Sequence, residues 1–181
     1  MTLNMYNYKI LLLGNKSVGK TSLLLRFLTN EFMNEVLDTV GVNLYSKCLK
    51  IENQNIRLNI WDFSGEQKFK FILPTYCKGA DGAFLIYDIT NRESFEDLRY
   101  WISFIKKYAK NIPTMLIGTK LDLNEYRVVS KRNIKELIKE FNPLSYIELS
   151  SKSGNNIEIP FNILVYFFYN NYIPKSLKIM I

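Results

Sequence analysis

The stretch LLLGNKSVGKTSLLLRF at residues 11–27 places glycine, lysine and threonine between two apolar runs. The residues YKILLL at 8–13 are typical of a buried strand, and TSLLLRFL at 21–28 is typical of a helix. Between them, GNKSVGKT at 14–21 fits the pattern G-x-x-x-x-G-K-S/T of a loop that binds phosphates. The stretch therefore predicts a strand, a phosphate-binding loop and a helix; a simple glycine-containing turn is the alternative.

The predicted loop has the chemistry needed to hold a nucleoside triphosphate. Gly14 and Gly19 lack a Cβ, so consecutive backbone N–H groups can converge on phosphate oxygens. The following helix points its positive end at the same place. We expect the Lys20 ammonium to reach the β- and γ-phosphates and the Thr21 hydroxyl to coordinate Mg²⁺. The nucleotide-binding residues expected here are Asn15, Lys16, Ser17, Val18, Gly19, Lys20, Thr21 and Ser22.

The rest of the chain alternates apolar strands with amphipathic helices. Period-two alternation at 42–51 and 55–62, around the residues ENQN, predicts a β-hairpin. A helix with Ser94 as its N-cap is expected at 94–109. Pro160 is expected in the first turn of the last helix. The other predicted elements are strands at 82–89, 112–118 and 145–150 and helices at 130–141 and 156–170.

This order predicts an α/β fold with a six-stranded, mostly parallel sheet that contains one antiparallel hairpin and carries helices on both faces. Ligands of such sheets bind at the carboxyl ends of the strands. The loops to inspect therefore follow residues 13, 62, 89, 118 and 149.

Composition limits the chemistry. A chain of 181 residues suits one domain, and its net charge of +7 fits an anionic partner: nucleic acid, a membrane surface or a phosphate ligand. A basic protein without a macromolecular anion is the alternative, because no Lys/Arg block exceeds two residues. The chain has no histidine, which excludes Ser-His-Asp triads and histidine metal sites. Cys48 and Cys77 lack a CxxC spacing, so we expect reduced thiols in a cytoplasmic protein.

Two polar loops predict a guanine site. In GTKLD, Asp122 can accept hydrogen bonds from N1–H and the 2-amino group of guanine, whereas adenine offers an acceptor at N1 and no 2-amino group. Thr119 belongs to this loop, and Lys120 is expected to lie over the base. In LSSKSG, the Ser151 N–H would donate to guanine O6 and Lys152 would pack beside the base. Plain polar turns are the alternative for both loops.

A further loop follows the strand that ends in LNIWD. Asp62 is expected to hold Mg²⁺ through water. The N–H of Gly65, in DFSGEQ, can meet a γ-phosphate. An ordinary turn after the strand is the alternative. Together these loops predict a site for GTP and GDP with Mg²⁺.

In order and spacing, these motifs resemble those of Ras-superfamily small GTPases, and in particular the Rab-like branch. The motifs that carry the resemblance are the phosphate loop, DTVGVN, WDFSGE, GTKLD and SSKSG, with VGVNL, RLNIW, KFKFILPTYCKGADG and LIYDIT for the Rab-like branch. GVN, ILP and LIGTK are also similar to septation-signalling small GTPases. The resemblance covers about residues 8–170 and implies a P-loop NTPase fold with a small GTPase domain at 8–172, an N-terminal extension at 1–7 and a short tail at 173–181.

The resemblance implies a molecular switch. Thr39 matches the threonine that binds Mg²⁺ and the γ-phosphate only in the GTP state, so residues 30–41 and 63–76 would order around GTP and relax after hydrolysis. Phe32 matches an aromatic residue that lies edge-on to the guanine; burial under the helix is the competing interpretation. The catalytic residues implied are Glu66, Gln67, Thr39 and Lys20.

The implied partners are effectors, exchange factors and GTPase-activating proteins, bound through residues 30–45 and 61–76 of a monomer that binds no nucleic acid. The tail has no cysteine for prenylation. Two alternatives are open for the tail: its apolar and basic residues contact an anionic membrane, or the tail is unordered. The protein is expected in the cytoplasm, peripherally at membranes. The residues expected on the effector face are Leu44, Trp61, Phe69 and Ile72.

Two departures from the family pattern bear on hydrolysis. Where the common pattern DxAGQE has the glutamine that orients the attacking water, this chain has Glu66 followed by Gln67. At roughly 5 Å and an effective dielectric constant near 20, a carboxylate and a phosphate charge repel by about 3 kcal/mol. Glu66 would therefore turn away, protonate or act as a base. Gln67 cannot simply substitute for that glutamine, because adjacent helical residues point about 100° apart. We expect slow or altered intrinsic hydrolysis.

The second departure is Lys16, which stands where the family has a small residue. One hypothesis is that it reduces dependence on a partner's arginine finger; a solvated lysine is the alternative. Beside the hydrolysing switch, two other functions are open: a GTP-loaded scaffold that scarcely turns over, and an ATP-dependent P-loop enzyme such as a small-molecule kinase. The kinase would need an arginine-rich lid, and the chain has few arginines and no insertion of that length.

Overall fold

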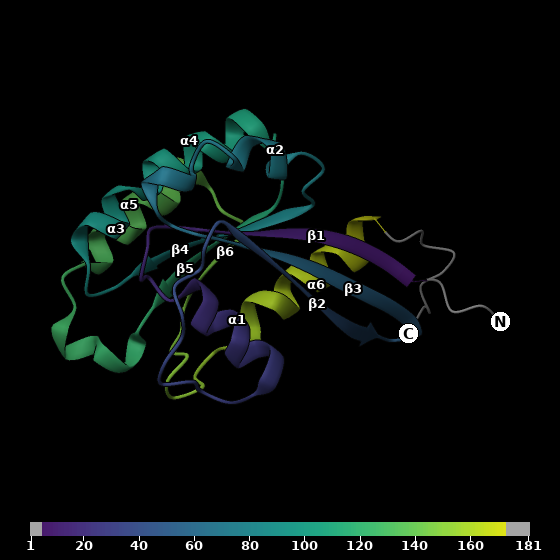
Figure 1. Cartoon of the computed structure of the whole chain (residues 1–181), viewed down its shortest axis with the longest axis horizontal. Helices are drawn as coiled ribbons and strands as arrows, with labels where there is room; N and C mark the ends of the chain where they lie inside the picture. Colours follow the sequence, from purple (N-terminus) through teal and green to yellow (C-terminus); the bar gives the residue numbers. More distant parts are fainter. Residues whose placement is uncertain (1–4, 173–181) are drawn as a thin grey trace.

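A mixed six-stranded sheet in the order β2-β3-β1-β4-β5-β6 forms the middle layer of the protein. The computed structural model describes residues 5–172, which leaves the predicted tail at 173–181 outside the described residues (Figure 1). Only β2 and β3 pair antiparallel; the other neighbours are parallel, which confirms the predicted fold class. The strands are β1 (Met5–Leu13), β2 (Val42–Ile51), β3 (Gln54–Phe63), β4 (Gly82–Asp88), β5 (Thr114–Thr119) and β6 (Ser145–Glu148).

Helices cover both faces of the sheet. In Figure 1, α1 and α6 lie on one side of it and α2, α3, α4 and α5 on the other. Within residues 5–172, no helix combines the length and the apolar character needed to span a membrane. The helices are α1 (Lys20–Thr29), α2 (Leu73–Cys77), α3 (Arg92–Glu96), α4 (Leu98–Tyr108), α5 (Lys131–Phe141) and α6 (Ile159–Tyr172), with 3₁₀ helices η1 (Gln67–Phe69) and η2 (Leu121–Tyr126).

The central strands are apolar throughout because both of their faces are covered. Successive side chains of a strand point to opposite faces. Accordingly, Ile10 and Leu12 of β1 pack in the core that includes α1 and α6, whereas Leu11 and Leu13 pack in the core that includes α4 and α5. All four are fully buried. The sheet thereby fixes the carboxyl end of β1, where the predicted phosphate loop begins.

The structure corrects two predicted boundaries. β1 begins at Met5, which pairs with Asn55, so residues 5–7 lie in the sheet rather than in an N-terminal extension. The helix predicted at 94–109 is divided into α3 and α4 by Asp97.

The predicted cap of the first of these helices is also wrong. The N-cap is Asn91, whose side chain accepts a hydrogen bond of 3.0 Å from the Ser94 N–H. The Ser94 hydroxyl is instead engaged by the backbone, because it accepts from the N–H of Asp88 at 3.1 Å and donates to the carbonyl of Asn91 at 2.8 Å. The helix therefore starts before Ser94. Pro160 lies in the first turn of α6, as predicted.

Candidate nucleotide-binding site

The loop between β1 and α1 borders a cavity of about 270 Å³, which we call the phosphate cavity. Gly14 has φ of +149° and lies against β4, where an added Cβ would be 2.2 Å from the carbonyl oxygen of Ile86. Gly19, with φ of +93°, makes the left-handed turn into α1. Both positions therefore require glycine. The lining of the phosphate cavity includes Lys16, Lys20, Thr21, Asp38, Thr39 and Glu66.

The Lys20 side chain is buried inside the loop. Its Nζ donates to the carbonyl oxygens of Gly14 at 3.0 Å and Asn15 at 2.7 Å. Burial lowers the pKa of Lys20 to about 8, although the charge of Asp62 acts in the opposite direction. The loop thus holds a partly desolvated ammonium at the place where the sequence predicts phosphates.

Three oxygen-bearing side chains from three segments converge beside Lys20. The Thr21 hydroxyl donates to Asp62 Oδ2 at 2.6 Å and lies 2.8 Å from the hydroxyl of Thr39. The other carboxylate oxygen, Asp62 Oδ1, is buried and has no hydrogen-bond partner among residues 5–172. Burial raises the pKa of Asp62, whereas the hydrogen bond from Thr21 lowers it.

This corner fits Mg²⁺, which is commonly held by one or two carboxylates and by substrate phosphates and keeps several waters. Two hydroxyls and one carboxylate supply hard oxygen ligands, and the unpartnered Asp62 Oδ1 can accept from a metal-bound water. Nowhere in the described part of the chain do three His, Cys, Asp or Glu residues gather as a metal cage.

The loops predicted to bind a base meet at a second cavity of about 230 Å³, which we call the base cavity. Gly19, Ser22 and Lys120 line both cavities, so the two are adjacent. Phe32, half-buried, lies on the wall of the base cavity, as required for contact with a base. The predicted residues that line it are Phe32, Thr119, Lys120, Asp122, Ser151 and Lys152.

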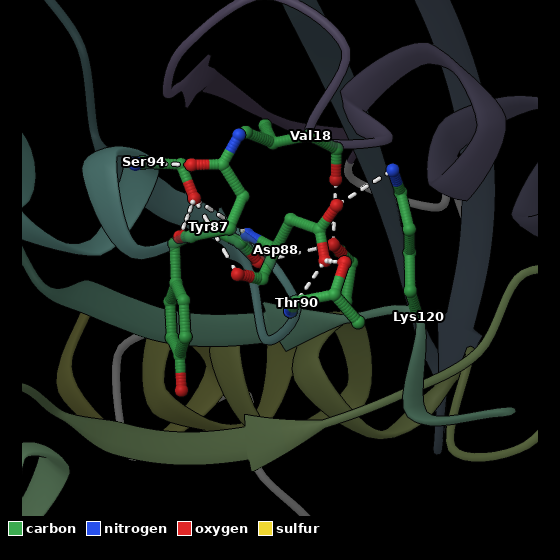
Figure 2. Close-up of polar contacts among 8 residues, drawn as sticks. Val18, Tyr87, Asp88, Thr90, Ser94 and Lys120 are labelled. Atoms are coloured by element: carbon green, nitrogen blue, oxygen red, sulfur yellow. Dashed lines mark hydrogen bonds and ion pairs between the residues drawn. The ribbon is translucent and has the colours of Figure 1, made fainter. Parts of the chain in front are cut away.

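Lys120 is held in place by a residue that the sequence analysis did not single out. Its Nζ forms an ion pair of 2.6 Å with Asp88 Oδ2 at the carboxyl end of β4 (Figure 2). The other oxygen of Asp88 accepts from the N–H and hydroxyl of Thr90, at 2.8 and 2.7 Å. An acidic residue at the end of the buried run GAFLIYDI was the only available signal for this role.

Thr119 and Asp122 are also fixed by neighbouring loops. The buried hydroxyl of Thr119 makes contacts of 2.6 Å to the carbonyl oxygen of Val18 and 3.0 Å to that of Tyr87. Asp122 Oδ1 accepts from the hydroxyl of Ser150 at 2.5 Å. The phosphate loop and both base loops are therefore joined through side chains.

A second ion pair joins the segments that carry the two base loops. The guanidinium of Arg127, just after η2, donates to both oxygens of Glu148 in β6, at 2.8 and 2.6 Å. Burial acts to raise the pKa of Glu148, but hydrogen bonds from Arg127 and Tyr146 outweigh it and the pKa is lowered. Glu148 therefore stays ionised, and the pair fixes the spacing of the loops.

The Asn15 side chain does not line the phosphate cavity and instead contacts the start of α4. Its Nδ2 donates to Asp97 Oδ2 at 2.7 Å, and its Oδ1 accepts from the indole N–H of Trp101 at 3.0 Å. The Asn15 side chain is thus engaged by Asp97 and Trp101, and only its backbone is open to the predicted role in phosphate binding. Gly65 packs on the same loop, since an added Cβ would lie 2.1 Å from the backbone nitrogen of Lys16.

In a comparison with known proteins, residues 9–169 match the model of the Ras family. The chain belongs to the Ras family. The chain is 42% identical over 161 residues to Ras-related protein Rab-1 of Theileria parva, covering 88% of this chain and 73% of that protein. It is 41% identical over 167 residues to Ras-related protein Rab-11B of Dictyostelium discoideum, covering 91% and 76%. It is 38% identical over 173 residues to Ras-related protein RABA4b of Arabidopsis thaliana, covering 95% of this chain and 77% of that protein.

These relatives confirm the predicted Rab-like branch of the Ras superfamily. Proteins of the Ras family bind GTP and GDP and hydrolyse GTP, so this chain is a GTPase. The kinase alternative is thereby set aside.

Glu66, expected from the resemblance to stand in place of the family's glutamine, is paired with two lysines. Glu66 Oε1 lies 3.0 Å from the Lys16 Nζ, and Oε2 lies 2.8 Å from the Lys68 Nζ. Hydrogen bonds from Lys68 and Lys16 lower the pKa of Glu66. The two ion pairs thus favour the ionised form of Glu66 in this structure. Gln67 begins η1.

Proposed function

We propose that this GTPase is a slow, Mg²⁺-dependent switch in membrane traffic, whose segments 30–41 and 63–76 close on GTP and relax on GDP. The observation that carries the proposal is the meeting of Thr39, Thr21 and Asp62, since the two hydroxyls lie only 2.8 Å apart. One of these residues belongs to a switch segment, one to the phosphate loop and one to the end of β3. A ligand bridging them would therefore couple nucleotide state to the conformation of residues 30–41.

In this proposal Thr21 and Thr39 hold Mg²⁺ directly and Asp62 holds it through water. Bound there, Mg²⁺ would neutralise the charge that develops on the transferred phosphoryl group. Lys20 would exchange its carbonyl partners in the loop for the β- and γ-phosphates. The ligand chemistry of the three side chains and the buried, unpartnered Asp62 Oδ1 support these roles.

The proposed slow rate follows from Glu66. A glutamine amide can both donate to and accept from an attacking water, whereas a carboxylate only accepts and adds negative charge near the γ-phosphate. The ion pairs with Lys16 and Lys68 support a paired, rather than a catalytic, carboxylate. The same observation favours a second candidate, a GTP-loaded scaffold with little turnover.

The proposed partners are effectors, exchange factors and GTPase-activating proteins, which would contact residues 30–45 and 61–76. Leu44 is 57% exposed, whereas Trp61, Phe69 and Ile72 are half-buried, so part of this face is available without rearrangement. The names of the relatives, all Ras-related Rab proteins, support a role in membrane traffic and a cytoplasmic protein peripheral to membranes.

Analysis of nucleotide in the purified protein and a single-turnover assay test the proposal. We expect bound guanine nucleotide, GTP hydrolysis that stops when EDTA removes Mg²⁺, and faster hydrolysis in Glu66→Gln. Lys20→Ala should abolish binding. Hydrolysis that is undetectable in the parent but present in Glu66→Gln would favour the scaffold. A preference for ATP, or equal rates in the parent and Glu66→Gln, would contradict the proposal.

A further inference from the structure

The Lys16 ammonium lies between acidic side chains of the two switch segments. Its Nζ is 2.8 Å from Asp38 Oδ2 and 3.0 Å from Glu66 Oε1. Lys68 binds the other oxygen of Glu66, at 2.8 Å. We call Lys16, Asp38, Glu66 and Lys68 the Lys16 cluster. Through it, one side chain of the phosphate loop joins segment 30–41 to segment 63–76.

The Lys16 cluster lies at the phosphate cavity. Lys16, Asp38 and Glu66 line this cavity together with Lys20 and Thr21. Close packing of Gly65 on the backbone of Lys16 brings Glu66 within reach of the ammonium, because a side chain at residue 65 would collide with the loop. The arrangement is therefore built into the backbone and does not depend on long side chains alone.

The charges of the cluster balance only when Lys16 is present. Two lysines face two carboxylates, and Lys16 is the sole ion-pair partner of Asp38 in the described part of the chain. Without Lys16, the unpaired Asp38 carboxylate and a half-paired Glu66 would face the bound nucleotide. GTP carries one phosphate more than GDP, at the end nearest these carboxylates, so the resulting repulsion falls mainly on GTP.

We propose that Lys16 sets the preference of this protein for GTP over GDP, as a positioning residue that neutralises Asp38 and Glu66 and draws both switch segments over the terminal phosphate. The inference rests on the proposed function for the location of that phosphate. It concerns binding and stands apart from the rate of hydrolysis.

The test compares dissociation constants for GDP and for guanosine 5′-(β,γ-imido)triphosphate at low salt with Mg²⁺. In Lys16→Met, which keeps the length of the side chain, we expect affinity for the triphosphate analogue to fall about tenfold and affinity for GDP to change less than about twofold. Adding Asp38→Asn to Lys16→Met removes one unpaired charge and should recover part of the loss. The effect should shrink as salt screens the charges.

Two controls separate this role from others. Lys135→Met removes the same net charge from the exposed surface of α5 and should leave both constants unchanged. Lys68→Met, which unpairs only the outer oxygen of Glu66, should have an intermediate effect. An unchanged ratio of the two constants in Lys16→Met, or equal loss of both ligands, would overturn the inference. A parent protein that binds neither ligand would instead overturn the proposed function.

Discussion

The hydroxyl of Thr119 lies where β4, β5 and the phosphate loop meet, within 2.6 Å of the Val18 carbonyl oxygen. Thr119→Val keeps the shape of the side chain but leaves that buried carbonyl without its partner. We expect it to lower the free energy of unfolding by about 1–2 kcal/mol and to release GDP about tenfold faster. Urea denaturation and release of a fluorescent nucleotide measure these effects. Thr119→Ser retains the hydroxyl and is the control; nucleotide release from the valine variant at the parent rate would contradict the prediction.

Asp122 is the residue whose carboxylate is proposed to select guanine. Two hydrogen bonds to a charged group are worth about 1.5–3 kcal/mol each, so Asp122→Ala should weaken GTP binding by at least about a hundredfold. It should also reduce discrimination against ATP. Competition between the two nucleotides measures this. Ser150→Ala removes only the hydroxyl that orients the carboxylate and should cost several-fold less. If Asp122→Ala still excluded ATP, guanine recognition would have to lie elsewhere.

At the scale of elements, the sequence predicts those features that local pattern determines. The strands of the sheet are apolar runs because both faces are covered, and the β2–β3 hairpin shows period-two alternation because it is less buried. The cap of α3 was missed because Asn91 and Ser94 are both good cap residues. The choice between them depends on a tertiary contact, from the N–H of Asp88 to Ser94.

The candidate site likewise has features that the sequence predicts and features that it does not. The motifs place the phosphate loop and the base loops, since each is a short run after a strand. The ion pairs of Lys120 with Asp88 and of Lys16 with Asp38 join segments far apart in the chain. No local periodicity marks such pairs, and they become visible only when the sheet has brought the loops together.

The N-cap of α5 offers a prediction for a single element. The Ser130 hydroxyl accepts a hydrogen bond of 3.2 Å from the Asn133 N–H, so it satisfies one of the free donors in the first turn. Ser130→Ala should lower the free energy of unfolding by about 1 kcal/mol. Urea denaturation measures this loss. Lys135→Ala, at an exposed position of the same helix, should change it by less than about 0.5 kcal/mol. Equal effects of the two substitutions would show that the cap does not stabilise α5.

At the scale of the whole molecule, the reactivity of the two cysteines can be used to measure opening of the folded structure. Cys48 is exposed on β2, whereas Cys77 is buried at the end of α2, beside the segment proposed to respond to nucleotide. Burial raises the pKa of Cys77 to about 11, with Lys9 acting weakly in the opposite direction. Between pH 9 and this value the unfolded chain loses a proton that the folded chain keeps. The contribution of this thiol to stability is therefore present below pH 9 and declines as the pH rises.

The same burial predicts how the thiols react at pH 8. Cys48 should react with an aromatic disulfide at the rate of a free thiol, and Cys77 only when the core opens. GDP with Mg²⁺ binds the folded state, so it should slow labelling of Cys77 in proportion to the stabilisation it provides and leave Cys48 unaffected. A time course in Cys48→Ser, which retains only Cys77, measures the labelling of Cys77 with and without nucleotide, and the fast phase of the parent protein measures that of Cys48. Cys77 lines neither the phosphate cavity nor the base cavity, so slower labelling there means that the ligand stabilises residues beyond those that line the cavities. Rapid labelling of Cys77 that nucleotide does not change would show instead that α2 opens independently of the nucleotide-binding site.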